Sequence, residues 1–117
     1  MKLKLSEAVS AYVVLGQFAN IKMGVKTSYA ISKNLRKLDP EYQHFETERK
    51  KLLSEYFHEV DGVPVVIPST KDEADKEFED LMNLEVDVDP YKFHLTDFGM
   101  TEVTPAQLLA IMWLIEE

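Results

Sequence analysis

The fold is decided by the stretch Ile31–Tyr56, which reads ISKNLRKLDPEYQHFETERKKLLSEY. Its large side chains recur at alternating spacings of four and three, and the set is Ile31, Leu35, Leu38, Tyr42, Phe45, Arg49, Leu52 and Tyr56. This spacing is typical of one face of an α-helix that runs over several heptads. Because the phase continues across Asp39-Pro40, we expect one long helix from about Thr27 to Tyr56, kinked at Pro40. At 1.5 Å per residue it would be about 45 Å long.

A second interpretation of Asp39-Pro40 stays open. Asp39 as N-cap with Pro40 at the first helical position is a good start for a new helix. A proline inside a helix also costs about 3 kcal/mol. The long stretch is therefore either one kinked helix or two helices that meet at residue 39.

Arg49 is the polar member of the apolar stripe. One interpretation is that it marks the point where the stripe leaves the core. The other is that it forms a buried ion pair that fixes the register of a partner helix, with the Leu52 side as an interface. Arg49 is therefore a candidate protein-binding residue.

The segment before the long helix predicts a first helix from about Ser6 to Asn20. Ser6 is a suitable N-cap, and Glu7 in the first turn suits the helix dipole. The expected buried face has helical spacing and consists of Leu5, Ala8, Val9, Tyr12, Gly16 and Ala19. Lys22–Lys26 would form the connection to the long helix.

The segment after it predicts two short strands and an acidic helix. Asp61-Gly62 is a strong turn pair, and Pro64 places the following Val-rich strand at a sheet edge. A third helix should begin at Ser69, with Ala74, Phe78, Leu81 and Met82 on its apolar face. Its other face is acidic, and these candidate binding residues are Asp72, Glu73, Asp75, Glu79 and Asp80. Alternation in 85–89 predicts a half-buried strand, and Tyr91, Phe93 and Leu95 alternate similarly.

The last helix has a well-defined start. Thr104 as N-cap, Pro105 at the first position and Gln107 at the third form a capping box. The helix then runs through Ile115 and is apolar on nearly every side. Such a helix is either central in the core or docked on a partner. For the second case the candidate anchors are Met112 and Trp113, because Trp is enriched at binding hot spots.

Composition narrows the classes of site that this chain can hold. Its 117 residues and 45% hydrophobic content fit one globular domain, residues 1–117, of helix-dominated α+β class. It has no cysteine, and its three histidines, His44, His58 and His94, lack metal-binding spacing. No glycine-flanked nucleophile or phosphate-binding loop is present in the sequence. We therefore expect a protein without a cofactor and without catalytic activity, and keep a small nucleotide-binding enzyme as an alternative.

The N-terminal residues resemble a signal peptide only in part. Lys2 and Lys4 precede an apolar stretch, but Glu7, Ser10 and Gln17 interrupt it. No apolar run approaches the roughly 20 residues that span a bilayer. We expect a cytoplasmic protein that does not bind membranes.

Charge is segregated along the chain, whose net charge is −8. Residues 1–38 carry +6, residues 39–70 carry −4 and residues 71–117 carry −10. Either the two ends attract each other, within the fold or across a dimer, or the acidic end meets a basic partner. A basic cluster near the N-terminus could touch phosphates, and it consists of Lys22, Lys26, Lys33, Arg36 and Lys37, with Tyr29 among them. The overall charge argues against direct nucleic-acid binding.

Several runs together resemble a group of short, uncharacterised proteins from phages and prophages of Gram-positive bacteria. They are residues 28–35, then Tyr42, Glu48-Arg49, Leu52-Leu53, Tyr56 and Gly62, then Phe78, the region 81–86 and the closing Thr104-Pro105 helix. The resemblance implies a phage-borne origin and a helical protein of unknown function, and it supplies no catalytic residues to carry over. With it we expect stoichiometric binding of a host or phage protein, as an inhibitor of a host defence machine or as an assembly factor. A virion or tail component and a homo-oligomer stay open.

Overall fold

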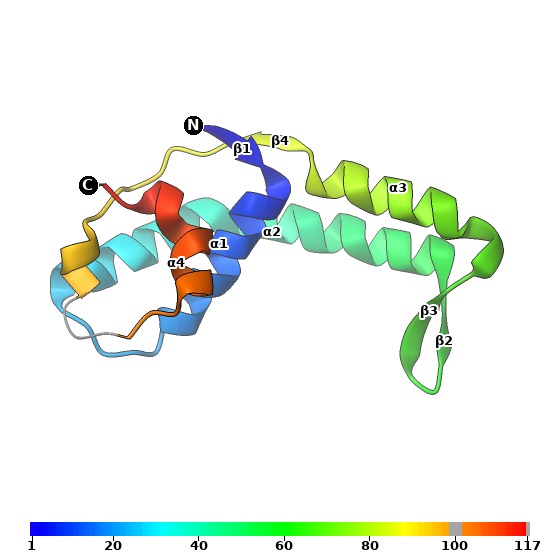
Figure 1. Cartoon of the computed structure of the whole chain (residues 1–117), viewed down its shortest axis with the longest axis horizontal. Coiled ribbons are helices and arrows are strands. Elements are labelled where there is room, and N and C mark those ends of the chain that lie inside the picture. Colours follow the sequence, from blue (N-terminus) through cyan, green and yellow to red (C-terminus); the bar gives the residue numbers. More distant parts are fainter. Residues whose placement is uncertain (99–101, 117) are drawn as a thin grey trace.

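The computed structural model describes residues 1–98 and 102–116 and confirms a helix-dominated α+β fold (Figure 1). The α-helices of these residues are α1 (Leu5–Phe18), α2 (Val25–Tyr56), α3 (Lys71–Met82) and α4 (Pro105–Ile111). The strands are β1 (Lys2–Lys4), β2 (Phe57–Val60), β3 (Val63–Val66) and β4 (Glu85–Asp87). Short 3-10 turns are η1 (Pro68–Thr70), η2 (Leu95–Phe98) and η3 (Met112–Leu114).

Helix α2 is continuous through Pro40, as the phase of its stripe predicts. Contacts to α1 hold the chain on both sides of the proline. Leu38 is buried, the Tyr42 ring stacks on Tyr12 with centroids 4.5 Å apart, and the Tyr12 hydroxyl donates to Asp39 Oδ1 at 2.8 Å. This hydrogen bond raises the pKa of Tyr12. The tertiary contacts therefore compensate for the backbone hydrogen bond that Pro40 cannot make.

The predicted start of the first helix was wrong. Helix α1 begins at Leu5, and Ser6 lies inside it. The reason is strand β1, which the sequence analysis did not predict. It pairs antiparallel with β4, with Leu3 opposite Val86, and keeps the chain extended up to Lys4. The Glu7 side chain then accepts the Lys4 backbone N–H at 3.0 Å, which caps the helix at that residue.

The predicted buried face of α1 was wrong in part. Leu5 and Ala8 are buried, together with Ala11, Leu15 and Phe18. Val9 and Tyr12 are half-buried, and Gly16 and Ala19 are exposed. The helix packs on both α2 and α4, so the side chains that it buries differ from those of the single predicted face.

The structure also differs from the predicted start of the third helix and from the strand predicted at residues 91–95. Helix α3 begins at Lys71, because Pro68–Thr70 form a 3-10 turn before it and Ser69 is not its N-cap. Residues 91–95 do not form a strand, and Phe93 makes one isolated parallel bridge with Ile115. The backbone of Tyr91 is instead hydrogen-bonded to the side chain of Asn34, which lies on α2. Its Nδ2 donates to the Tyr91 carbonyl at 2.7 Å, and its Oδ1 accepts the Tyr91 N–H at 2.9 Å.

The molecule has a compact head and a projecting arm. We define the arm as residues 39–83, which hold the second half of α2, the β2–β3 hairpin and α3, and the head as the rest. The radius of gyration is 16.9 Å, against about 13 Å for a compact chain of this length. Figure 1 shows α3 alongside the second half of α2, with the hairpin at the far end. The fully buried residues of α2 end at Leu38, so the main core lies in the head.

Candidate protein-binding site

The predicted site residues lie in two separate places. The five acids of α3 and Arg49 lie on the arm, whereas Met112 and Trp113 lie in η3 of the head. The structure therefore does not bring the two predicted sets together.

The acidic side chains of α3 lie on both flanks of its buried stripe. Ala74 and Leu81 are buried against α2. The Phe78 ring meets the Phe57 ring edge-on, with the ring centroids 5.9 Å apart. The exposed acids are Asp72, Glu73, Asp75, Glu77, Glu79 and Asp80. Among the described residues, Lys71 pairs with Asp75 at 2.7 Å, and this hydrogen bond raises the pKa of Lys71. The other acids face water on the arm.

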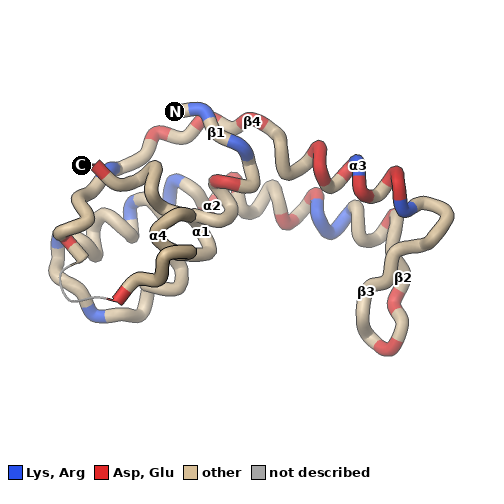
Figure 2. The backbone as a smooth tube through the Cα atoms, in the orientation of Figure 1, with Lys and Arg blue, Asp and Glu red and all other residues tan. Residues whose placement is uncertain are grey.

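The arm carries the whole net charge of the chain. Residues 39–83 hold thirteen acidic and five basic side chains, which gives −8, and the rest of the chain holds eight of each. Figure 2 shows the acidic residues along α3 and the hairpin. A negative field on a projecting arm attracts cationic surfaces and repels anionic ones.

Part of the charge segregation is satisfied inside the head. Lysines of residues 1–38 pair with acids of residues 85–97, and the pairs are Lys2–Glu85 at 3.4 Å, Lys26–Asp97 at 3.7 Å and Lys37–Asp89 at 3.6 Å. Because the head holds equal numbers of acidic and basic side chains, its net charge is zero, and the acidic excess of the chain lies on the arm.

Arg49 pairs within its own helix. Its Nε and terminal nitrogen donate to the two carboxylate oxygens of Glu46 at 3.0 and 2.9 Å. The hydrogen bond with Arg49 lowers the pKa of Glu46. The Arg49 side chain is 37% exposed, and the ion pair that the structure shows joins two residues of one helix. An ion pair between Arg49 and a partner helix stays a prediction. The last fully buried residue of α2 is Leu38, and the stripe is half-buried both before and after Arg49. Arg49 therefore does not mark the point where the stripe leaves the core.

The C-terminal helix is shorter than predicted. The capping box at Thr104 is confirmed, since Gln107 N–H donates to the Thr104 hydroxyl at 3.1 Å. However, α4 ends at Ile111, and Ile115 is extended because it bridges to Phe93. Met112 is 48% exposed, whereas Trp113 is half-buried against the core. The indole nitrogen of Trp113 is buried without a hydrogen-bond partner among the described residues.

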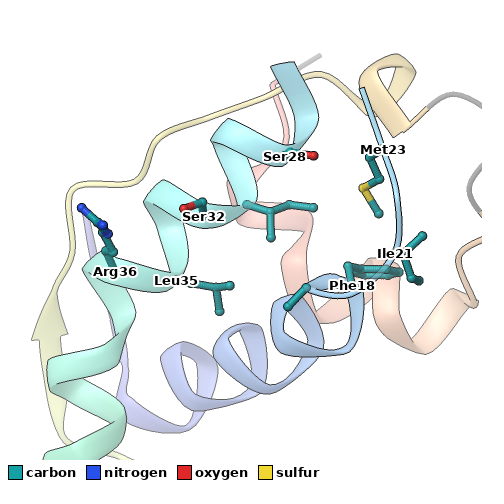
Figure 3. Close-up of a pocket in the computed structure, with 9 residues that line it drawn as sticks. Phe18, Ile21, Met23, Ser28, Ser32, Leu35 and Arg36 are labelled. Carbon is teal, nitrogen blue, oxygen red and sulfur yellow. The ribbon is translucent and has the colours of Figure 1, made fainter. Parts of the chain in front are cut away.

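A groove in the head is a feature that the sequence analysis missed. It lies between the end of α1, the connection 19–24 and the first turns of α2, and has a volume of about 310 Å³ (Figure 3). Its lining residues are Phe18, Ala19, Ile21, Met23, Ser28, Ile31, Ser32, Leu35 and Arg36. A neighbouring hollow shares Ser32 and Arg36 with it and adds Tyr29, Lys33 and Lys37. The basic cluster near the N-terminus was the signal that could have pointed to it.

Other kinds of site receive no support from the described residues. In residues 1–98 and 102–116, no three His, Cys, Asp or Glu side chains come together as metal ligands would. Within the same residues, no helix has the length and apolarity that crossing a bilayer requires.

Comparison with known proteins gives no further guide to the site. No family model, curated protein or solved structure matches this chain.

Proposed function

We propose that this chain is a non-enzymatic, phage-derived accessory protein of the host cytosol that binds a protein partner stoichiometrically through the acidic face of its arm. The observation that carries the proposal is the location of the net charge of −8 on residues 39–83, away from a neutral head. An excess of charge on a projecting element suits recognition of an oppositely charged surface.

The partner has a basic protein surface. The acids of α3 stand on both sides of its buried stripe, so carboxylates run along both flanks of the helix. Proteins that bind nucleic acids carry such basic surfaces. An inhibitor of a host defence machine and an assembly factor both fit this chemistry, and the identity of the partner separates them.

The test is calorimetric titration against a panel of purified nucleic-acid-binding proteins. We expect one of them to saturate at a fixed whole-number ratio. The double variant Asp72→Lys, Glu79→Lys should weaken that binding by at least tenfold, about 1.4 kcal/mol. The control Glu102→Lys, Glu116→Lys makes the same change in net charge on exposed residues of the head. Equal affinities of the two double variants would remove the acidic face from the proposal.

The alternative of a small nucleotide-binding enzyme has its own test. A ligand that binds only the native state raises the melting temperature. A thermal-shift screen with nucleotides and divalent metals should leave the melting temperature unchanged. A saturable increase with a nucleotide would favour the enzyme.

A further inference from the structure

The tip of the arm exposes an apolar face. Strands β2 and β3 pair antiparallel around Asp61-Gly62, with Val60 opposite Val63 and His58 opposite Val65. Because side chains alternate along a strand, these four share one face of the hairpin. Val60, Val63 and Val65 are 46%, 59% and 39% exposed. The opposite face packs on the arm through Phe57, which contacts Phe78.

The groove of the head is apolar, as the exposed face of the tip is. Its floor is apolar, with Phe18, Met23, Ile31 and Leu35 among its lining residues (Figure 3). Removing apolar surface from water stabilises a complex by about 25 cal/mol for each Å² that is buried. Valine side chains are small enough to enter a groove of about 310 Å³.

The charges around the two surfaces are also complementary. Glu59 and Asp61 are exposed at the tip and belong to the arm, whose charge is −8. Arg36 lies at the junction of the groove and the neighbouring hollow, which also holds Lys33 and Lys37. Among the described residues Arg36 takes part in no ion pair. Tip against groove therefore brings opposite charges together, whereas tip against tip would bring two negative arms together.

The tip of a molecule is remote from its own groove. Figure 1 shows the hairpin at the far end of the arm and the α1–α2 connection, which borders the groove, at the opposite end of the head. The longest dimension of the molecule is 51 Å. Any contact between the two surfaces must therefore join different copies.

We propose that the β2–β3 tip of one copy docks into the groove between α1 and α2 of a second copy, with Val63 against the apolar floor and Asp61 near Arg36. The contact is head-to-tail, so it produces a closed ring or an open chain according to the rotation between copies. This inference concerns the hairpin and the groove, and it does not depend on the acidic face of α3.

The test measures absolute mass by light scattering after gel filtration, at up to about 1 mM protein and at about 0.1 M and 1 M salt. We expect wild-type masses above the 13.5 kDa of one chain that fall at high salt. Val63→Asp should damage the tip, and Arg36→Glu the groove, each weakening association by at least tenfold. Val25→Asp and Lys50→Glu are matched controls on exposed residues outside both surfaces, and they should associate like wild type.

Mixing the two damaged variants gives the decisive result. Each variant keeps one intact surface, so Val63→Asp and Arg36→Glu together should form a 1:1 dimer and nothing larger. A wild type that stays at 13.5 kDa throughout would overturn the proposal. So would a mixture without dimers. Tip-to-tip association would leave Arg36→Glu alone able to dimerise, and groove-to-groove association would leave Val63→Asp alone able to do so, so either result for a single variant would also contradict the proposal. Equal disruption by Val25→Asp would also contradict it.

Discussion

Asn34 should be one of the most important side chains for stability, although it is polar. It is 1% exposed and lies on α2 in the head. Its amide group donates to the carbonyls of Ala30 at 3.0 Å and Tyr91 at 2.7 Å, and it accepts the Tyr91 N–H at 2.9 Å. The side chain thus holds the segment after β4 against the helix. Asn34→Ala would leave both backbone groups of Tyr91 without their partner.

The expected loss follows from these contacts. A buried polar group that loses its partner costs about 1–3 kcal/mol. Tyr91 is 38% exposed, so water can replace part of each bond, and we take about 1 kcal/mol for each of its two groups. The cavity adds about 1 kcal/mol, and the better helix propensity of Ala returns about 0.7 kcal/mol or less. The net loss in the free energy of unfolding is then about 2–3 kcal/mol.

Urea denaturation followed by Trp113 fluorescence measures this loss. With an m value of about 2 kcal/mol per M, the midpoint should fall by about 1–1.5 M at unchanged m. Gln43→Ala is the control, because Gln43 is exposed on the same helix, and it should change stability by no more than about 0.5 kcal/mol. If Asn34→Ala lies within that range of Gln43→Ala, the role assigned to Asn34 is refuted. Asn34→Asp should be worse than Ala at pH 7, since it buries a carboxylate beside the Tyr91 carbonyl.

Three further predictions concern the arm. Pro40→Ala should stabilise the protein by up to about 3 kcal/mol, because Pro40 is exposed inside α2 and alanine restores a helical hydrogen bond; a fall in the urea midpoint would contradict this. Gly62→Ala should loosen the hairpin, since Gly62 has φ of 79°. Amide exchange of residues 57–66 should then accelerate while the core stays protected, and unchanged exchange would argue against it. The pKa of Glu46 is lowered below 4.5 by Arg49, so the stability that this pair provides is present above about pH 4.5 and disappears as pH falls through the folded pKa. At pH 7 the wild type should therefore have a higher urea midpoint than Glu46→Gln, and near pH 3 this difference should disappear. A difference in midpoint that does not change with pH would exclude the ion pair as its source.

Local patterns in the sequence predicted the elements that local physics controls. The phase of the stripe in 31–56 predicted α2 through Pro40, because helical periodicity depends on residues three and four apart. Asp61-Gly62 predicted the hairpin, since both residues adopt the positive φ that a two-residue turn requires. Thr104, Pro105 and Gln107 predicted the start of α4, because a capping box satisfies its own backbone groups.

Contacts between distant segments decided the rest. Strand β1 forms only because β4 lies beside it, and no pattern within Lys2–Lys4 specifies that partner. The end of α4 depends on Phe93, and the position of Tyr91 depends on Asn34. Summed along the sequence, charge divides into a basic start and an acidic end. The fold pairs part of that start with residues 85–97 and leaves the net charge on the arm, because ion pairing depends on distance in space.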